Sequence, residues 1–262
     1  NVPFSTTFIG IKIPYVSDGF TYQYVNANNS AIFGQGSGSG SGNNISIPLP
    51  EVGEYIVNIY PTSSFRFTFI SLTDAEREKF VMLSQWGDAG WFGSVYGMFA
   101  GCSKLQITAT DIPNFSNVAN MERMFAGCTA LNTVPNMNSW DVSKVNSMYL
   151  MFAGATNFNQ DIGNWNTSKV TNMGSMFNGA KAFNQNIGSW NVSNVTDMEY
   201  MFWNATNFNQ NIGNWNVSKA SMKQMFLNAA AFNQNLGNWQ LKNGTELGFD
   251  NSGMDCQNFS KT

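Results

Sequence analysis

The sequence contains no histidine, and charged residues make up only 11% of its 262 residues. Histidine is the most frequent acid–base side chain in enzymes and a common zinc ligand, so its absence removes the simplest catalytic and zinc sites. The few acidic residues are scattered, and no glycine-rich phosphate-binding motif or calcium loop is present. We therefore predict that the protein is not an enzyme and that it uses no cofactor and no metal.

The charges that are present nearly balance. The 13 basic and 16 acidic side chains leave a net charge of -3, and this composition predicts no basic stripe. The electrostatic attraction that drives binding to nucleic acid or to anionic membranes is then missing. No segment is long and apolar enough to span a bilayer. We expect contacts with sugars or neutral protein surfaces, no nucleic acid and no direct membrane insertion.

Cysteine is also scarce, with three residues and no C-x-x-C motif. Cys102 and Cys128 occupy the same place in two similar Ala-Gly-Cys segments. If these segments stack, their backbones lie roughly 4.8 Å apart, which is near the range that a disulfide tolerates. Two interpretations follow: a buried ladder of small apolar side chains, which we favour, and a Cys102–Cys128 disulfide.

The sequence has, instead, a repeat of roughly 25 residues. Met-Phe pairs stand at 98–99, 124–125, 151–152, 176–177, 201–202 and 225–226. A second motif, Phe-Asn-Gln-(Asp/Asn)-(Ile/Leu)-Gly, occurs at 158–163, 183–188, 208–213 and 232–237. A fixed period of this length is typical of a solenoid.

Each repeat is predicted to contain one short helix and one short strand. Val170, Met173 and Met176 recur at the spacing of one helix face. Phe158–Ile162 alternates, which predicts a strand whose phenylalanine, glutamine and isoleucine face the core. The predicted fold is an α/β solenoid, a leucine-rich-repeat-like right-handed stack of short strand plus short helix, with an N-terminal β-sandwich.

The chain divides into four predicted segments. Residues 1–70 do not repeat and predict a small β-sandwich of the PKD or immunoglobulin type, with the glycine-serine run 34–42 as a flexible loop. Residues 71–97 predict a helix, from Leu72 to Leu83 with a capping box at Thr73, and the N-terminal cap of the solenoid. Residues 98–247 are the strand–helix repeats, and 248–262 the C-terminal cap.

The repeat Asn-Trp-Asn-Val-Ser-Asn-Val-Thr-Asp-Met-x-x-Met-Phe resembles the surface-protein repeat of BspA-type leucine-rich-repeat bacterial proteins, over roughly residues 84–260. The segment 53–59, Gly-Glu-Tyr-Ile-Val-Asn-Ile, is similar to the closing strand of the PKD-like β-sandwich that often precedes such repeats. The resemblance implies a secreted, extracellular or cell-surface protein that binds host proteins, matrix or other cells. It supplies no catalytic residues.

The outward positions of the predicted strands are nearly all asparagine. They are Asn159, Asp161, Asn184, Asn186, Asn209, Asn211, Asn233 and Asn235. Their donors and acceptors suit sugar hydroxyls or peptide backbone, but a row that only solubilises and stiffens the sheet is an equal alternative. Asp161 forms no carboxylate pair, because the equivalent residues are asparagines, and a glycosidase needs two carboxylates.

Aromatic residues offer two further candidates. Tryptophans recur once per repeat at 140, 165, 190, 215 and 239. A sugar-stacking row is conceivable, but exact repetition favours a packed core ladder. Tyr149, Tyr200 and Trp203 do not repeat and are therefore better recognition candidates.

We expect a non-enzymatic, surface-exposed adhesion or recognition module that binds protein or glycan through the exposed face of the solenoid. The alternative is a structural subunit of a cell-surface layer, filament or virion that self-associates. The expected partners are a protein or glycan on another cell, the host or the matrix, and possibly copies of the chain itself.

Overall fold

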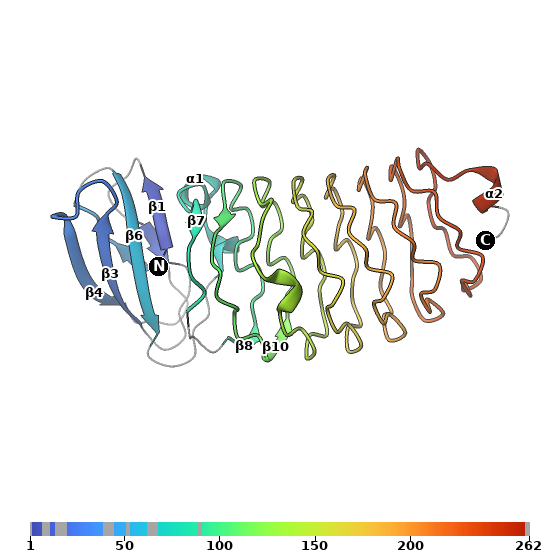
Figure 1. Ribbon diagram of the computed structural model, residues 1–262, viewed down its shortest axis with the longest axis horizontal. Coiled ribbons are helices and arrows are strands. Elements are labelled where there is room, and N and C mark those ends of the chain that lie inside the picture. Colours follow the sequence, from blue (N-terminus) through green and yellow to red (C-terminus); the bar gives the residue numbers. More distant parts are fainter. Residues whose placement is uncertain are drawn as a thin grey trace.

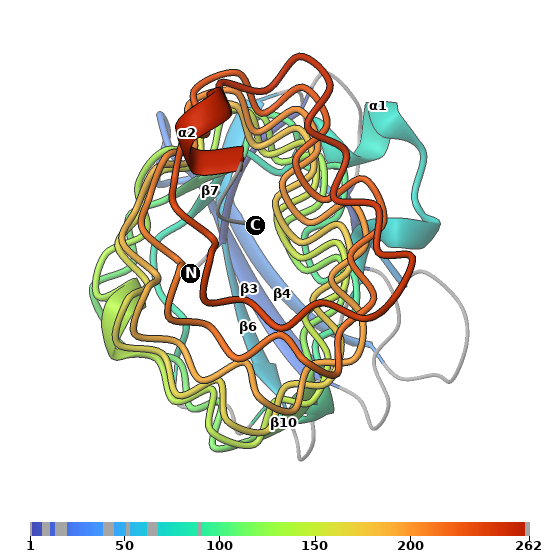
Figure 2. The ribbon, with the colours of Figure 1, turned by 90° about the vertical axis from the view of Figure 1, so that its right-hand side faces the viewer.

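The computed structural model describes residues 2–6, 11–13, 20–38, 45–50, 53–61, 68–87 and 91–259. The molecule is elongated, with β-strands at one end and consecutive loops of the chain stacked toward the C-terminal end (Figure 1). Viewed along the long axis, these loops follow nearly the same outline (Figure 2). We call each unit of roughly 25 residues a repeat loop, and residues 91–255 the repeat stack.

The N-terminal part contains two antiparallel sheets. A four-stranded sheet has the order β1-β6-β3-β4, and a two-stranded sheet pairs β2 with β5. The strands are β1 (Val2–Thr6), β2 (Ile11–Ile13), β3 (Phe20–Asn26), β4 (Phe33–Gly38), β5 (Ile45–Ile47) and β6 (Gly53–Pro61). Phe20, Tyr55 and Val57 form part of the buried core on this side.

Strand β4 lies where the sequence predicted a flexible glycine-serine loop, so that prediction is wrong for residues 34–38, and residues 39–42 lie outside the described part. In the β3–β4 register Tyr24 is opposite Gly34. A Cβ placed on Gly34 would lie 2.5 Å from the Tyr24 hydroxyl oxygen. The tyrosine ring therefore covers the glycine, and its packing replaces the side chain that β4 lacks.

A short segment joins the sheets to the repeat stack. It contains η1 (Phe69–Ser71) and α1 (Asp74–Arg77). The predicted helix from Leu72 to Leu83 is thus confined to one turn, although the Thr73 N–H donates to the Glu76 carboxylate at 3.3 Å, as a capping box requires. The chain then becomes extended, and β7 (Met82–Leu83) pairs in parallel with β9 (Gln106–Ile107).

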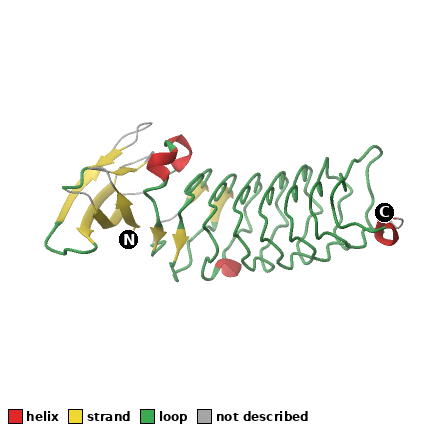
Figure 3. Cartoon of the chain, turned by 90° about the horizontal axis from the view of Figure 1, so that it is seen from above, coloured by secondary structure: helices red, strands yellow, loops and turns green. Residues whose placement is uncertain are grey.

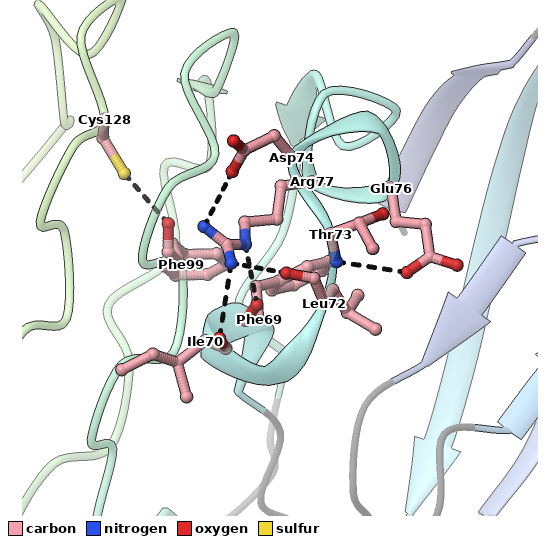
Figure 4. Close-up of polar contacts among 9 residues, drawn as sticks. All are labelled: Phe69, Ile70, Leu72, Thr73, Asp74, Glu76, Arg77, Phe99 and Cys128. Atoms are coloured by element: carbon pink, nitrogen blue, oxygen red, sulfur yellow. Dashed lines mark hydrogen bonds and ion pairs between the residues drawn. The ribbon is translucent and has the colours of Figure 1, made fainter.

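Arg77 holds this junction together (Figure 4). Its guanidinium donates to the carbonyl oxygens of Phe69 at 3.1 Å, of Ile70 at 3.4 Å and of Leu72. It also forms an ion pair of 3.1 Å with Asp74. One side chain thereby donates to three backbone carbonyls, of which that of Phe69 also accepts the Leu72 N–H at the end of η1.

The predicted α/β solenoid of one strand and one helix per repeat is wrong. From residue 91 to residue 259, the described chain is mostly turns and loops (Figure 3). Its regular elements are β8 (Phe92–Ser94), β9, β10 (Asn117–Asn120), η2 (Met137–Ser139) and α2 (Cys256–Phe259). β8 and β10 pair in parallel.

Left-handed backbone explains why the predicted repeat helices do not form. Each Met-x-x-Met segment contains a residue at positive φ: Arg123, Leu150, Ser175, Tyr200 and Gln224, with φ between 51° and 59°. A right-handed helix cannot pass through that conformation. The Met124 N–H instead donates to the Met121 carbonyl as in a turn. The Met121 N–H donates to the carbonyl of Ser147 in the next repeat loop at 3.0 Å.

The predicted strand at Phe158–Ile162 is absent too. Phe158 and Ile162 are buried, but Gln160 is half-exposed and donates to the Asn132 carbonyl of the preceding loop instead of facing the core. The bridges between repeat loops lie where the helices were predicted to begin. They join Asn120, Ser147, Asn172, Asp197 and Ser221 in parallel register, one residue per loop.

The core of the repeat stack consists of aromatic ladders. The rings of Phe152 and Phe177 stack with centroids 5.7 Å apart, and those of Trp165 and Trp190 with centroids 6.3 Å apart. Trp190 is 3% exposed, and its Nε1–H donates to the Ile162 carbonyl at 3.1 Å. The tryptophan row is thus a packed core ladder, as favoured, and its faces are not available to sugars.

Candidate recognition surface

Four of the predicted binding residues connect one repeat loop to the next. The Oδ1 atom of Asn159 accepts the backbone N–H of Asn184, Asn184 accepts that of Asn209, and Asn209 accepts that of Asn233, each at 2.9 Å. Asn233 accepts from the Asp255 N–H at 3.0 Å. These side chains replace the backbone partners that a sheet would provide, because no strand forms here.

The other four residues each close a turn within their own repeat loop. The side-chain oxygens of Asp161, Asn186, Asn211 and Asn235 accept the N–H of the glycine two residues later, at 2.9–3.0 Å. Such Asx turns are a common use of these side chains. All eight predicted residues therefore have structural roles. The amide nitrogens of Asn159, Asn184 and Asn209 have no partner within the described residues and remain as surface donors.

Tyr200 and Trp203 form an aromatic pair on the outside of the repeat stack. Their ring centroids are 5.5 Å apart with an interplanar angle of 41°, and both side chains are half-buried. The Trp203 Nε1 atom is buried and has no hydrogen-bond partner among the described residues. A buried donor without an acceptor costs about 1–3 kcal/mol.

The repeat does not require aromatic residues at these two places. The Gly179 N–H donates to the Trp203 carbonyl just as the Gly154 N–H donates to the Asn178 carbonyl, so Trp203 and Asn178 are equivalent. By the same comparison, Leu227 is the equivalent residue in the following loop. The stack accepts asparagine and leucine where Trp203 stands, so packing alone does not account for the tryptophan.

Tyr149 lies apart from this pair. The bridges from Ser147 through Asn172 to Asp197 place it two repeat loops before Tyr200. The Arg123 guanidinium lies 5.8 Å from the centroid of its ring, a cation–π distance. No ring contact joins Tyr149 to the Tyr200–Trp203 pair in the described chain. The structure thus brings two of the three predicted aromatic candidates together.

Asp197 and Glu199, which the sequence did not single out as site residues, shortly precede this pair in the chain. Asp197 accepts the Glu199 N–H at 2.9 Å, and Glu199 accepts the Ser221 hydroxyl at 2.6 Å. Burial, together with the negative charge of Glu199, raises the pKa of Asp197 above its ordinary value. In the described part of the chain no three potential ligands gather as a metal site would require.

The predicted alternative of a Cys102–Cys128 disulfide is wrong. Both residues are free thiols and fully buried. Cys128 Sγ donates to the Phe99 carbonyl at 3.1 Å (Figure 4). Burial raises the pKa of both thiols, so the reactive thiolate is disfavoured. They act as small core side chains.

Comparison with known proteins identifies a family. The family described as "Mycoplasma protein of unknown function, DUF285" matches residues 93–196 and again 162–260, which together cover more than half of the chain. No curated protein and no solved structure matches. Within the described residues, no helix is both long enough and apolar enough to cross a membrane.

Proposed function

The chain belongs to the DUF285 family of Mycoplasma proteins of unknown function, and we propose that it is a non-enzymatic recognition module that binds protein or glycan. The binding surface is centred on Tyr200 and Trp203. The resemblance to BspA-type repeats and the weakly charged surface support an extracellular or cell-surface location and a partner on another cell, the host or the matrix.

The Tyr200–Trp203 pair carries this proposal. Tyrosine and tryptophan are enriched in recognition surfaces because they combine a large apolar face with a polar group. Here they stand together at two positions where the other loops carry different residues, and the Trp203 Nε1–H has no partner among the described residues. Because neighbouring loops carry asparagine or leucine at the place of Trp203, a ligand that contacts the indole accounts for the tryptophan better than packing does.

The test is a glycan and matrix-protein array probed with purified protein. A Tyr200→Ala/Trp203→Ala double variant should lose the strongest signals, by about tenfold or more if the pair contributes as binding hot spots do. Tyr60→Ala is the matched control, because it removes a ring that is 49% exposed on the N-terminal sheet. If the double variant and the control bind as the wild type does, the aromatic pair is not the site.

The alternative of a self-associating structural subunit is favoured by one observation. β4 lies at the edge of its sheet, pairing only with β3 among the described strands, and Phe33 at its start is 74% exposed. An open edge strand can pair with another chain. Light scattering over a range of protein concentrations, with electron microscopy, tests this. Ordered assembly that Phe33→Lys abolishes would support the subunit, and a monomer at all concentrations would rule it out.

A further inference from the structure

Lysines are aligned along the repeat stack although the chain as a whole is slightly acidic. Lys144 and Lys169 each stand three residues before a bridge residue, Ser147 and Asn172, which pair with each other. The two lysines therefore occupy the same place in neighbouring repeat loops. Asn194 takes this place in the next loop, three residues before the bridge residue Asp197. Lys219 and Lys242 continue the line, since Lys219 contacts Asn194 and Lys242 contacts Lys219. We call Lys144, Lys169, Lys219 and Lys242 the lysine row, and all four are exposed.

Neutral oxygens of the preceding loop hold three of these ammonium groups. Lys144 Nζ donates to Asn117 Oδ1 at 2.9 Å, and Lys219 Nζ donates to Asn194 Oδ1 at 3.1 Å. Lys242 Nζ donates to the Lys219 carbonyl. The bonds orient the ammonium groups along the row without neutralising them. The ion pairs in the described part of the chain lie elsewhere, at and near α1.

A line of amide donors runs beside the lysine row. The Oδ1 atoms of Asn166, Asn191 and Asn216 each accept the hydroxyl of the serine two residues later, at 2.7–2.8 Å. Their amide nitrogens are exposed and have no partner in the described structure. Asp141 takes this place in the loop of Lys144, and its pKa is lowered by hydrogen bonds from Ser143 and by Lys144. Apart from that carboxylate, the strip offers donors and positive charge.

We propose that the lysine row binds a linear acidic polysaccharide, laid along the repeat stack. Neighbouring loops at the level of the row are roughly 5 Å apart, so an extended polyanion can bring carboxylate or sulfate groups to the lysines on either side of Asn194. Charge-assisted hydrogen bonds from the ammonium groups hold the anionic groups. The amide donors bind hydroxyl and ring oxygens of the same chain.

The composition of the strip favours a polysaccharide over other polyanions. Binding of single-stranded nucleic acid relies on aromatic side chains that stack on bases, whereas the tryptophans of the ladder, Trp140, Trp165, Trp190, Trp215 and Trp239, are buried in the core. Attachment to an anionic membrane is strengthened by apolar side chains that enter the bilayer. Lys144, Lys169 and Lys219 each stand between a serine and a buried valine or alanine, and Lys242 stands between the half-buried Leu241 and Asn243. The lysine row shares no residue with the Tyr200–Trp203 pair, so this proposal does not depend on binding at that pair.

The experiment compares two double variants that lose the same charge. Lys169→Gln/Lys219→Gln removes two members of the row. Lys181→Gln/Lys223→Gln removes two other exposed lysines from the repeat stack. Binding is measured against a sulfated polysaccharide (heparin), a carboxylated one (polygalacturonate) and neutral dextran, and against single-stranded DNA and phosphatidylserine vesicles. Equal melting temperatures confirm that both variants are folded.

The wild type should bind the acidic polysaccharides but not dextran, with an affinity that falls steeply as salt rises. The row variant should lose about tenfold or more in affinity, and the control less than about twofold. Comparing the affinity for heparin with that for polygalacturonate shows whether the row prefers sulfate or carboxylate groups. Equal losses in both variants, no binding to either acidic polysaccharide, or tighter binding to DNA or vesicles would overturn the proposal.

Discussion

The side-chain oxygen of Asn184 accepts the backbone N–H of Asn209 at 2.9 Å. This oxygen takes the place of the backbone carbonyl that a neighbouring strand would provide in a sheet. The same oxygen also accepts from Gln210 Nε2 at 2.9 Å. Two donors of the next loop thus depend on one residue. The asparagines that sequence reasoning assigned to ligand binding are first of all the connections between loops.

Replacing Asn184 with alanine should therefore loosen the stack locally. The Asn209 N–H would lose its acceptor, at a cost of about 1–2 kcal/mol. Hydrogen exchange followed by mass spectrometry should show that the variant exchanges faster than the wild type around residues 207–212, and at the wild-type rate around residues 132–138. Asn191→Ala is the control, since its side chain closes a turn within its own loop. Exchange that is unchanged in Asn184→Ala would contradict the assigned role.

Asp197 makes stability depend on pH in a definite direction. Burial raises its pKa in the folded state, so its stabilising contribution is present at low pH and is lost as pH rises through that folded-state pKa. At neutral pH the charged form is therefore unfavourable. Asn172 occupies the equivalent place and accepts the Gly174 N–H at 2.8 Å without carrying charge.

Asp197→Asn should consequently raise the melting temperature at pH 7, and the gain should shrink as the pH is lowered toward about 3, where both forms are neutral. The reverse exchange, Asn172→Asp, should lower the melting temperature at pH 7. Calorimetry across this pH range measures both. A gain in Asp197→Asn that is the same at every pH would show that charge is not the cause.

Two tryptophans should lose very different amounts of stability when replaced by phenylalanine. Trp190 is stacked on both sides and donates to the Ile162 carbonyl. Trp190→Phe removes that hydrogen bond, leaving the Ile162 carbonyl with only the Trp165 N–H, and opens a void, with an expected loss of about 2–4 kcal/mol. Trp203→Phe removes a donor that has no partner and should cost less than about 1 kcal/mol. Urea denaturation of the two variants gives the comparison, and equal losses would contradict it.

Sequence reasoning located the repeat, the buried methionines and aromatics, and the tryptophan ladder, because burial imposes the period directly. It misjudged the backbone, because Met-x-x-Met has the same apolar spacing in a helix and in these turns. The deciding conformation is the positive φ of Arg123, Leu150 and Tyr200, and such residues carry no strong left-handed preference. The column of Gly127, Gly154 and Gly179, all at positive φ, was the available signal for turns.

Some residues of the candidate binding surfaces could likewise be predicted from the sequence, and others could not. Tyr200 and Trp203 could be singled out because they break the repeat, and the structure brings them together. The lysine row could not be inferred from a composition that counts every charge in the chain. Only the register of the loops places Lys144 beside Lys169. The Asp197–Glu199 pair was missed for the same reason.

The last prediction concerns the N-terminal sheet. Gly34 faces Tyr24 across β3 and β4, and a Cβ there would lie 2.5–2.9 Å from three atoms of the tyrosine side chain. Gly34→Val should therefore displace the ring and destabilise the sheet by about 1–3 kcal/mol, although valine is the better strand former. Combining it with Tyr24→Ala should restore part of the loss, because the valine then has room. A double variant whose loss equals the sum of the two single losses, measured by urea denaturation, would show that the tyrosine does not need the glycine.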